Sequence, residues 1–179
     1  LVTTFDGLGL LDTSNVTNMR GMFCSLGSKS DVAPTLNFSG FDTSNVEDMG
    51  QMFQGYGQYS TTVPTIDLSN FNTSNVTNMG CMFELYGANS DIALTIDLSN
   101  FNTRNVTNMR RMFRGTGIEI LDVSTFDTNN VESEGLDCFA GLNSLHTIIL
   151  NDNFGQSSNL SVSGATYNDP NYATGMFYV

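Results

Sequence analysis

One motif of thirteen residues recurs along this chain of 179 residues. Residues 71–83 read FNTSNVTNMGCMF, residues 41–53 read FDTSNVEDMGQMF, and residues 101–113 read FNTRNVTNMRRMF. Anchored on Thr-x-Asn-Val, five copies begin at Thr13, Thr43, Thr73, Thr103 and Thr128, at intervals of 30, 30, 30 and 25 residues. Such a period is typical of repeat folds, in which one unit cannot bury its apolar face alone and neighbouring units must stack.

A second pattern, apolar-x-x-apolar-x-apolar-x-x-Phe, precedes the later copies of the motif. It has the L-x-x-L-x-L spacing of leucine-rich repeats. In the segment TIDLS, Ile66 and Leu68 alternate with Asp67 and Ser69, as a strand buried on one side requires. The pattern occurs as Ala33, Leu36, Phe38, Phe41; as Val63, Ile66, Leu68, Phe71; as Ala93, Ile96, Leu98, Phe101; and as Ile118, Leu121, Val123, Phe126.

The thirteen-residue motif carries helical spacing. Val76, Met79, Met82 and Phe83 fall at i, i+3, i+6 and i+7, and Ser74 stands at the N-cap position. Eight of the nine Met residues occupy the two paired positions of this stripe, and we interpret them as core residues rather than as an adaptable binding groove.

Together these patterns predict an α/β solenoid of the leucine-rich-repeat type, coiled right-handedly. A parallel β-sheet is expected on one face and short helices on the other. About five units occupy residues 1–150, and a small β-like cap is expected over residues 151–179.

Composition and motifs exclude several classes of function. The net charge is −12, although only 13% of residues are charged, which argues against nucleic acid and anionic membrane surfaces as partners. No apolar run is long enough to insert into a membrane, and the N-terminal residues lack the form of a signal peptide, so we expect any anchor to lie outside this fragment. No phosphate loop, nucleophile elbow or metal-ligand spacing is present, and the single His146 lies in an apolar strand pattern, so we expect no enzyme activity, cofactor or metal.

The three Cys residues lie in the first, third and fifth units. At least two strand spacings therefore separate any pair, about 9.6 Å, which exceeds the reach of a disulfide. We predict that Cys24, Cys81 and Cys138 are free thiols, largely buried.

Residues 66–83, IDLSNFNTSNVTNMGCMF, resemble the repeat of BspA-like leucine-rich-repeat surface proteins, in which LDLSNFDTSNVTNMxxMF recurs. The resemblance extends over residues 5–154. It implies a bacterial, secreted or wall-attached protein that acts as an adhesin for host or microbial surfaces. The units here are longer than the family's usual ones, and no wall-sorting motif is present.

The five additional residues of the longer units suggest a first binding surface. Insertions in a repeat fold project from one side, and here they carry Tyr56, Tyr59 and Tyr86. Exposed tyrosines suit recognition of proteins or sugars, because a rigid ring combines apolar area with a hydroxyl group. Alternatively, the rings fold back over the helices as a lid.

The exposed side of the sheet is a second candidate. Stacked strands would place Asn37, Asp67, Asp97 and Asp122 in one column, where adjacent carboxylates would raise one another's pKa. Such a strip could bind sugars or other ligands best at low pH, or it could be merely a solvated ladder.

Arginines in the fourth unit are the third candidate. Arg104, Arg110, Arg111 and Arg114 could read sialylated or sulfated glycans through bidentate contacts, or they could offset neighbours such as Glu84 and Glu119. Three Asn-Val-Thr sequons also occur, at the expected starts of helices, and we interpret them as structural.

The sequence therefore predicts an extracellular, monomeric binding module of the bacterial cell surface. Its expected ligand is host mucin, an extracellular-matrix protein or a surface glycan. The alternative is a structural spacer that presents another domain and has no ligand of its own.

Overall fold

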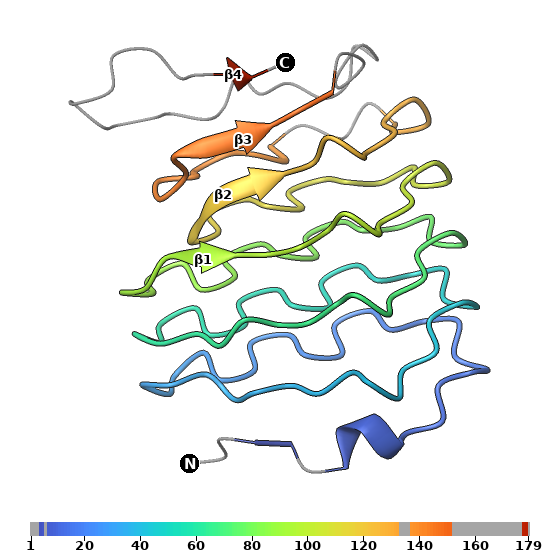
Figure 1. The fold of residues 1–179 in the computed structure, drawn as a ribbon, viewed down its shortest axis with the longest axis horizontal. Coiled ribbons are helices and arrows are strands. Elements are labelled where there is room, and N and C mark those ends of the chain that lie inside the picture. Colours follow the sequence, from blue (N-terminus) through green and yellow to red (C-terminus); the bar gives the residue numbers. More distant parts are fainter. Residues whose placement is uncertain (1–3, 6, 133–136, 152–176, 179) are drawn as a thin grey trace.

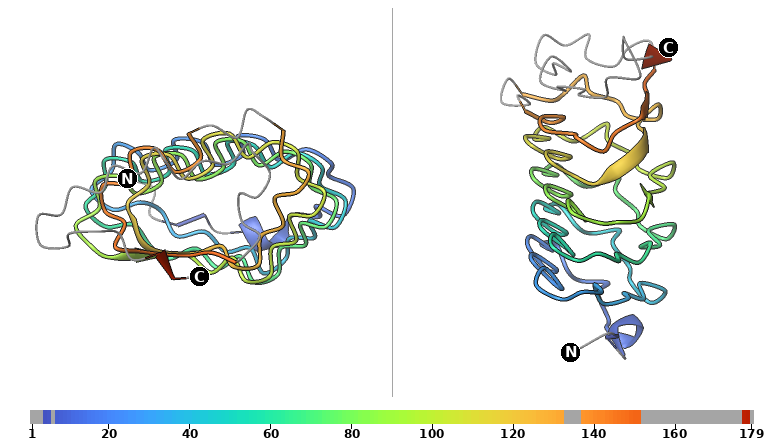
Figure 2. Two further views of the ribbon diagram at one scale, coloured as in Figure 1. Left: turned by 90° about the horizontal axis from the view of Figure 1, so that it is seen from above. Right: turned by 90° about the vertical axis from the view of Figure 1, so that its left-hand side faces the viewer.

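The repeats form layers. The structure, a computed structural model, describes residues 4–5, 7–132, 137–151 and 177–178. Each unit makes one circuit and lies directly on the unit before it (Figure 1), and seen from above the circuits superpose as similar ovals (Figure 2). Parallel bridges join residues 30 positions apart, such as Asp48 with Asn78 and Asn78 with Asn108, so the sequence period is also the spatial period.

One side of the stack is a short parallel sheet. Its strands are β1 (Leu94–Thr95), β2 (Ile118–Asp122), β3 (Thr147–Ile149) and β4 (Phe177–Tyr178), in the order β1-β2-β3-β4. The earlier units follow the same path but contribute isolated parallel bridges, such as that between Val32 and Thr62. The predicted parallel sheet is therefore present, but it is shorter than one strand per unit.

The predicted helices on the opposite side are wrong. Within the described residues there is no α-helix, and the single 3-10 helix, η1 (Leu8–Leu10), precedes the first copy of the motif. The Met-containing segments are runs of turns instead. Ser74, the expected N-cap, donates its backbone N–H and its hydroxyl to the Asn72 side chain of its own unit, as in an Asx turn.

Hydrogen bonding explains why these segments are turns. In the second unit the N–H groups of Met49, Gln51 and Phe53 donate to carbonyls of the third unit, over 3.0, 2.8 and 2.9 Å. The residue between two such donors bonds within its own unit: the Met52 N–H donates to the Met49 carbonyl, an i→i+3 turn bond. A helix would bond every N–H internally, so it could not hold the layers together in this way.

The turns require left-handed backbone at fixed positions. Gln51 and Gly55 have φ values of 60° and 64°, and Cys81 and Leu85 repeat these values one unit later, at 57° and 58°. L-residues adopt this region at a cost of about 1 kcal/mol or more, and interior helix residues do not adopt it at all. The pairing between units stabilises a conformation that local preference disfavours.

Columns of identical side chains fill the interior. The rings of Phe23, Phe53, Phe83, Phe113 and Phe139 stack along the axis, with centroids 5.6–5.9 Å apart and planes within 10° of parallel. Aromatic pairs of this kind contribute about 0.5–1.5 kcal/mol each beyond their area of burial. One unit cannot make such a contact, and repetition of the sequence is therefore the source of the core.

The methionines of the paired positions are core residues as predicted, with one exception. Met52 and Met82 are fully buried, whereas Met22 in the first unit is 41% exposed. One strand position also differs from expectation. Leu94 rather than Ala93 points into the core, because an irregularity in the β1–β2 pairing shifts the register between Leu94 and Thr95.

The Thr-x-Asn-Val signature is explained by contacts between layers. The buried Thr73 hydroxyl donates to the Asn102 carbonyl of the next unit and accepts from the Asn102 N–H. Asn75 donates its side-chain amide to the Ser44 carbonyl of the previous unit, and Val76 is fully buried. Each signature residue therefore bonds or packs against a neighbouring layer, which is why the same residues recur.

The predicted C-terminal cap over residues 151–179 lies almost entirely outside the described residues. In this region only Asn151 and the backbone of β4 are described.

Candidate functional site

The polar column on the sheet side is built as predicted, but its members are engaged locally. Asp67 and Asp97 accept the backbone N–H groups of Ser69 and Ser99, over 3.0 and 2.9 Å. The other two members of the column make the equivalent bonds, Asn37 to Ser39 and Asp122 to Ser124. Each side chain therefore closes an Asx turn at a corner of its layer.

The predicted rise in pKa is wrong for Asp67 and Asp97. The pKa of Asp67 is lowered, chiefly by hydrogen bonding to the Ser69 side chain and secondly to the Ser69 backbone N–H. Ser99 lowers the pKa of Asp97 in the same way, and repulsion from Asp67 is the weakest of the contributions. Hydrogen bonds stabilise the charged form more than exposed neighbouring carboxylates destabilise it. Preferred binding at low pH thus loses its physical basis.

The predicted tyrosine surface is mostly absent. Tyr56 and Tyr86 are fully buried, with ring centroids 5.5 Å apart, and their hydroxyls donate to the carbonyls of Pro34 and Pro64. Burial raises the pKa of both phenols. Of the three predicted rings only Tyr59 is exposed, at 62%.

The additional residues are not projecting loops. They extend the run of turns and pair with the neighbouring layer, as the Gly57 N–H does with the Leu26 carbonyl and the Tyr59 N–H with the Ser28 carbonyl. Tyr56 and Tyr86 are not among the additional residues. The 25-residue unit has Thr116 at the same position, three residues after its stacked Phe113, and Thr116 is buried as well.

The arginines of the fourth unit do not form one free basic patch. Arg114 pairs with the buried carboxylate of Glu84 at 3.0 Å, as the charge-balance interpretation predicts. Arg111 has left-handed backbone and is partly buried, and its Nε has no hydrogen-bond partner among the described residues. Arg104 and Arg110 are exposed. Glu119, the other carboxylate expected beside the arginines, lies 3.7 Å from His146.

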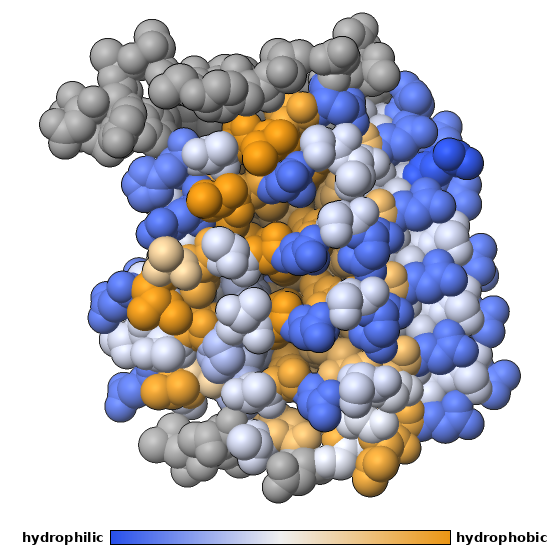
Figure 3. Space-filling view, viewed as in Figure 1, coloured by the Kyte–Doolittle hydropathy of each residue, from blue (hydrophilic) through white to orange (hydrophobic). Residues whose placement is uncertain are grey.

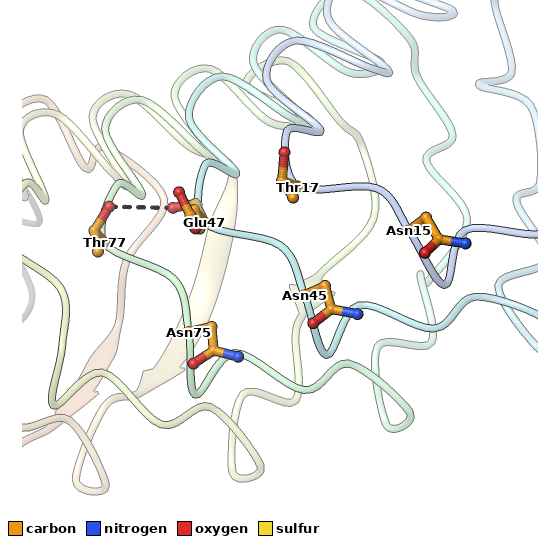
Figure 4. A pocket seen from close by; sticks show the side chains of 6 residues that line it. All are labelled: Asn15, Thr17, Asn45, Glu47, Asn75 and Thr77. Atoms are coloured by element: carbon orange, nitrogen blue, oxygen red, sulfur yellow. Dashed lines mark hydrogen bonds between the residues drawn. The ribbon is translucent and has the colours of Figure 1, made fainter.

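A polar groove that the sequence reasoning did not single out lies across the first three units. It has a volume of about 720 Å³ and is lined by Asn15, Thr17, Asn45, Glu47, Asn75 and Thr77. Figure 4 shows two columns, asparagines in one and Thr17, Glu47 and Thr77 in the other, with one member of each column from each unit. The volume falls in the range of small-molecule sites.

Bonds to the previous layer fix the asparagine amides. Asn45 Nδ2 donates to the Ser14 carbonyl over 2.7 Å, and Asn75 Nδ2 donates to the Ser44 carbonyl over 2.6 Å. The Oδ1 atoms of these two side chains make no hydrogen bond within the described residues. The groove therefore holds oriented acceptors at the interval of the layers.

The sequence did contain a signal for this groove. Asn15, Asn75 and Asn105 belong to the Asn-Val-Thr sequons that we interpreted as structural features at buried helix starts. The asparagine bonds bear out the structural role, but there is no helix here and the side chains are exposed. A side chain that bonds the neighbouring layer through one atom still presents the other to solvent.

The free thiols are confirmed within the described structure, since Cys24, Cys81 and Cys138 form no disulfide. Cys138 is buried, Cys81 is partly buried and Cys24 is exposed, so the expectation of burial fails for Cys24. Burial raises the pKa of Cys138 to about 12 and is the main cause that raises the pKa of Cys81 to about 11.

Two other features, a metal-binding cluster and a membrane-spanning helix, are absent from the described residues. None of their His, Cys, Asp and Glu side chains gather in a group of three or more that could hold a metal ion. Among the same residues, no helix combines the length and the apolar character needed to span a membrane.

Comparison with known proteins agrees with the repeats. No curated protein and no solved structure matches the chain. The family described as "Mycoplasma protein of unknown function, DUF285" matches residues 2–92 and residues 28–153, and these two overlapping matches include every copy of the motif. The chain therefore belongs to DUF285, a repeat family related to surface proteins.

Proposed function

We propose that this chain is an extracellular binding module of a bacterial cell surface, an adhesin that recognises host mucin, matrix protein or glycan through the polar groove. The observation that carries the proposal is the pair of side-chain columns formed by Asn15, Asn45 and Asn75 with Thr17, Glu47 and Thr77. Fixed acceptors beside hydroxyl groups suit a ligand that offers many hydroxyl or N–H donors.

We also propose a more specific family and a more specific fold for this chain. The motif resembles that of BspA-like surface proteins, and we propose that the layers form a right-handed solenoid of the leucine-rich-repeat type. The parallel sheet on one side and the 30-residue bridges support this architecture. A stacked repeat suits surface recognition, because it presents the same groups many times along one axis.

Retention of the protein on immobilised mucin, matrix proteins and glycans tests the proposal. Replacing both Thr17 and Thr77 by Val removes two hydroxyls from the groove and keeps their shape. We expect retention to fall at least severalfold. Thr65→Val is the matched control, because Thr65 is exposed on the sheet side, away from the groove.

A structural spacer is the second candidate. The sheet-side carboxylates favour it, because Asp67 and Asp97 accept hydrogen bonds from their own turns rather than being left free for a ligand. A spacer predicts no retention on any surface. If Thr65→Val reduces retention and the groove variant does not, the binding site lies on the sheet side instead.

A further inference from the structure

We propose that the groove binds a neutral, extended polysaccharide that runs along the stacking axis, with successive sugars facing successive units. This inference rests on the proposed function and names the ligand class of the same site. It follows from three properties of the groove: the kind of hydrogen-bonding atom that is free, the interval at which that atom recurs, and the charge beside it.

The free atoms are acceptors. Asn45 and Asn75 use Nδ2 to bond the Ser14 and Ser44 carbonyls, and this bond sets the plane of each amide. Figure 4 shows the amides of the groove in one common orientation. Oriented acceptors require ligand donors, and a sugar chain supplies hydroxyl donors on every residue.

The interval of the column selects the type of polymer. Hydrogen-bonded layers lie about 4.8 Å apart, so equivalent oxygens recur at that distance. In an extended peptide, side chains on the same face are about 6.7 Å apart, and a polyproline II segment rises about 3.1 Å per residue. Neither interval matches the spacing of the layers, so neither kind of peptide stays in register over three layers. Successive pyranose rings of a linear glycan are spaced close to the layer interval. Every ring carries hydroxyl donors on its edges, whichever face it turns to the groove, so a linear glycan can offer one donor to each layer.

Charge excludes acidic glycans. Glu47 is the one ionisable side chain among the six that line the groove, and it lies between Thr17 and Thr77 (Figure 4). The chain as a whole carries a net charge of −12. Sulfated or sialylated chains would be repelled both locally and at long range, so the groove favours neutral sugars.

Weak contacts repeated along a polymer predict that affinity depends on ligand length. None of the six lining residues is aromatic, so a single sugar has no ring to stack on. Each additional sugar that reaches another unit should tighten binding about fivefold, as expected for one further net hydrogen bond. The gain should end when the glycan spans the three units of the groove.

Titration calorimetry with neutral β-linked gluco-oligosaccharides of two to six sugars tests this inference. Heparin fragments and oligosialic acid of matched length are the anionic probes. We expect affinity to rise up to about three sugars and then level off, with at least tenfold weaker binding of the anionic chains. Affinity that does not depend on length, or tighter binding of heparin, would overturn the inference.

Two substitutions locate the binding. Asn75→Ala removes an acceptor and also the bond to Ser44, so its folding must be checked by the signal of the buried tyrosines. Thr77→Val removes one long internal bond, the 3.3 Å bond that the Thr77 hydroxyl donates to the Glu47 carbonyl, and should fold normally. Both should weaken binding of the longest glycan about fivefold, whereas Thr65→Val should not change it. Glycan binding that is unaffected by Thr77→Val would place the ligand elsewhere and refute the inference.

Glu47→Gln tests the charge argument. It should leave binding of neutral glycans within about twofold and reduce the discrimination against anionic chains. If the protein is retained on mucin or matrix protein through the groove but binds no neutral oligosaccharide, the proposed function stands and this inference fails. If no surface or sugar binds at all, both fail.

Discussion

Met82 and Met22 occupy the same position in two copies of the motif and differ only in what surrounds them. Met82 has a neighbouring layer on each side and is fully buried. Met22 belongs to the first layer and is 41% exposed. Substitution of each by Ala therefore measures what stacking contributes to the same side chain in the same turn.

The expected magnitudes follow from burial. Truncation of a fully buried Met removes its transfer free energy and leaves a cavity, which costs about 2–5 kcal/mol. The Met22 side chain is only partly buried, and the space left by its truncation would be open to water. Met22→Ala should therefore cost about 1 kcal/mol or less.

Urea unfolding measures both losses. The emission of the buried Tyr56 and Tyr86 reports the interior, and far-UV circular dichroism reports the turns and sheet. Both probes are needed because repeat arrays do not always unfold in a single step. Met82→Ala should lower the free energy of unfolding by at least about 2 kcal/mol more than Met22→Ala does. Equal losses would show that stacking of layers is not the source of the core.

Four further predictions follow from particular contacts. Gln51→Gly should leave the urea midpoint unchanged or raise it, because Gly adopts a φ of 60° without strain. Gln51→Val should lower the free energy of unfolding by more than about 1 kcal/mol, because a branched residue is strained at this φ. If the segment were a helix, Gln51→Gly would instead lower the urea midpoint. Because the pKa of Asp97 is lowered in the folded state, its carboxylate contributes stability above pH about 4, and this stability is lost as the pH falls through the folded pKa. The urea midpoint should therefore stay constant from pH 7 to 5 and decrease below pH about 4, and the decrease should be smaller in Asp97→Asn. A decrease already at pH 6 would contradict this reasoning. Iodoacetamide followed by mass spectrometry should modify the exposed Cys24 first and the buried Cys138 only on unfolding, and early modification of Cys138 would contradict its position. Glu84→Ala should cost about 2 kcal/mol in urea unfolding, because the buried carboxylate accepts hydrogen bonds from the units on both sides, over 2.7 and 3.0 Å; a loss below about 0.5 kcal/mol would count against that role.

The buried positions were predictable, whereas the element that carries them was not. Val76, Met79, Met82 and Phe83 are all buried, as their spacing predicts. That spacing fits an α-helix, but a run of three-residue turns satisfies it equally well. What distinguishes the two is where each backbone N–H bonds, and the partner lies in another copy of the motif, 30 residues away.

The candidate sites differ from expectation for a related reason. Tyr56 was assigned to an exposed inserted loop, and Asp67 to an exposed column of carboxylates with a raised pKa. Tyr56 instead occupies a position that the 25-residue unit also buries, as Thr116, and the exposed Asp67 carboxylate closes its own turn. The groove was overlooked because Asn45 and Asn75 have a structural role that explains their recurrence without a ligand.

The sequence by itself determined the period, the residues of the core and the parallel side of the stack, because identical units can bury their apolar faces only against one another. The tertiary structure decided the backbone conformation of the Met segments, the direction of each tyrosine and the position of the groove. These features depend on hydrogen bonds and ring contacts between layers, and the free energy that selects them comes from the neighbouring unit rather than from residues adjacent in the chain.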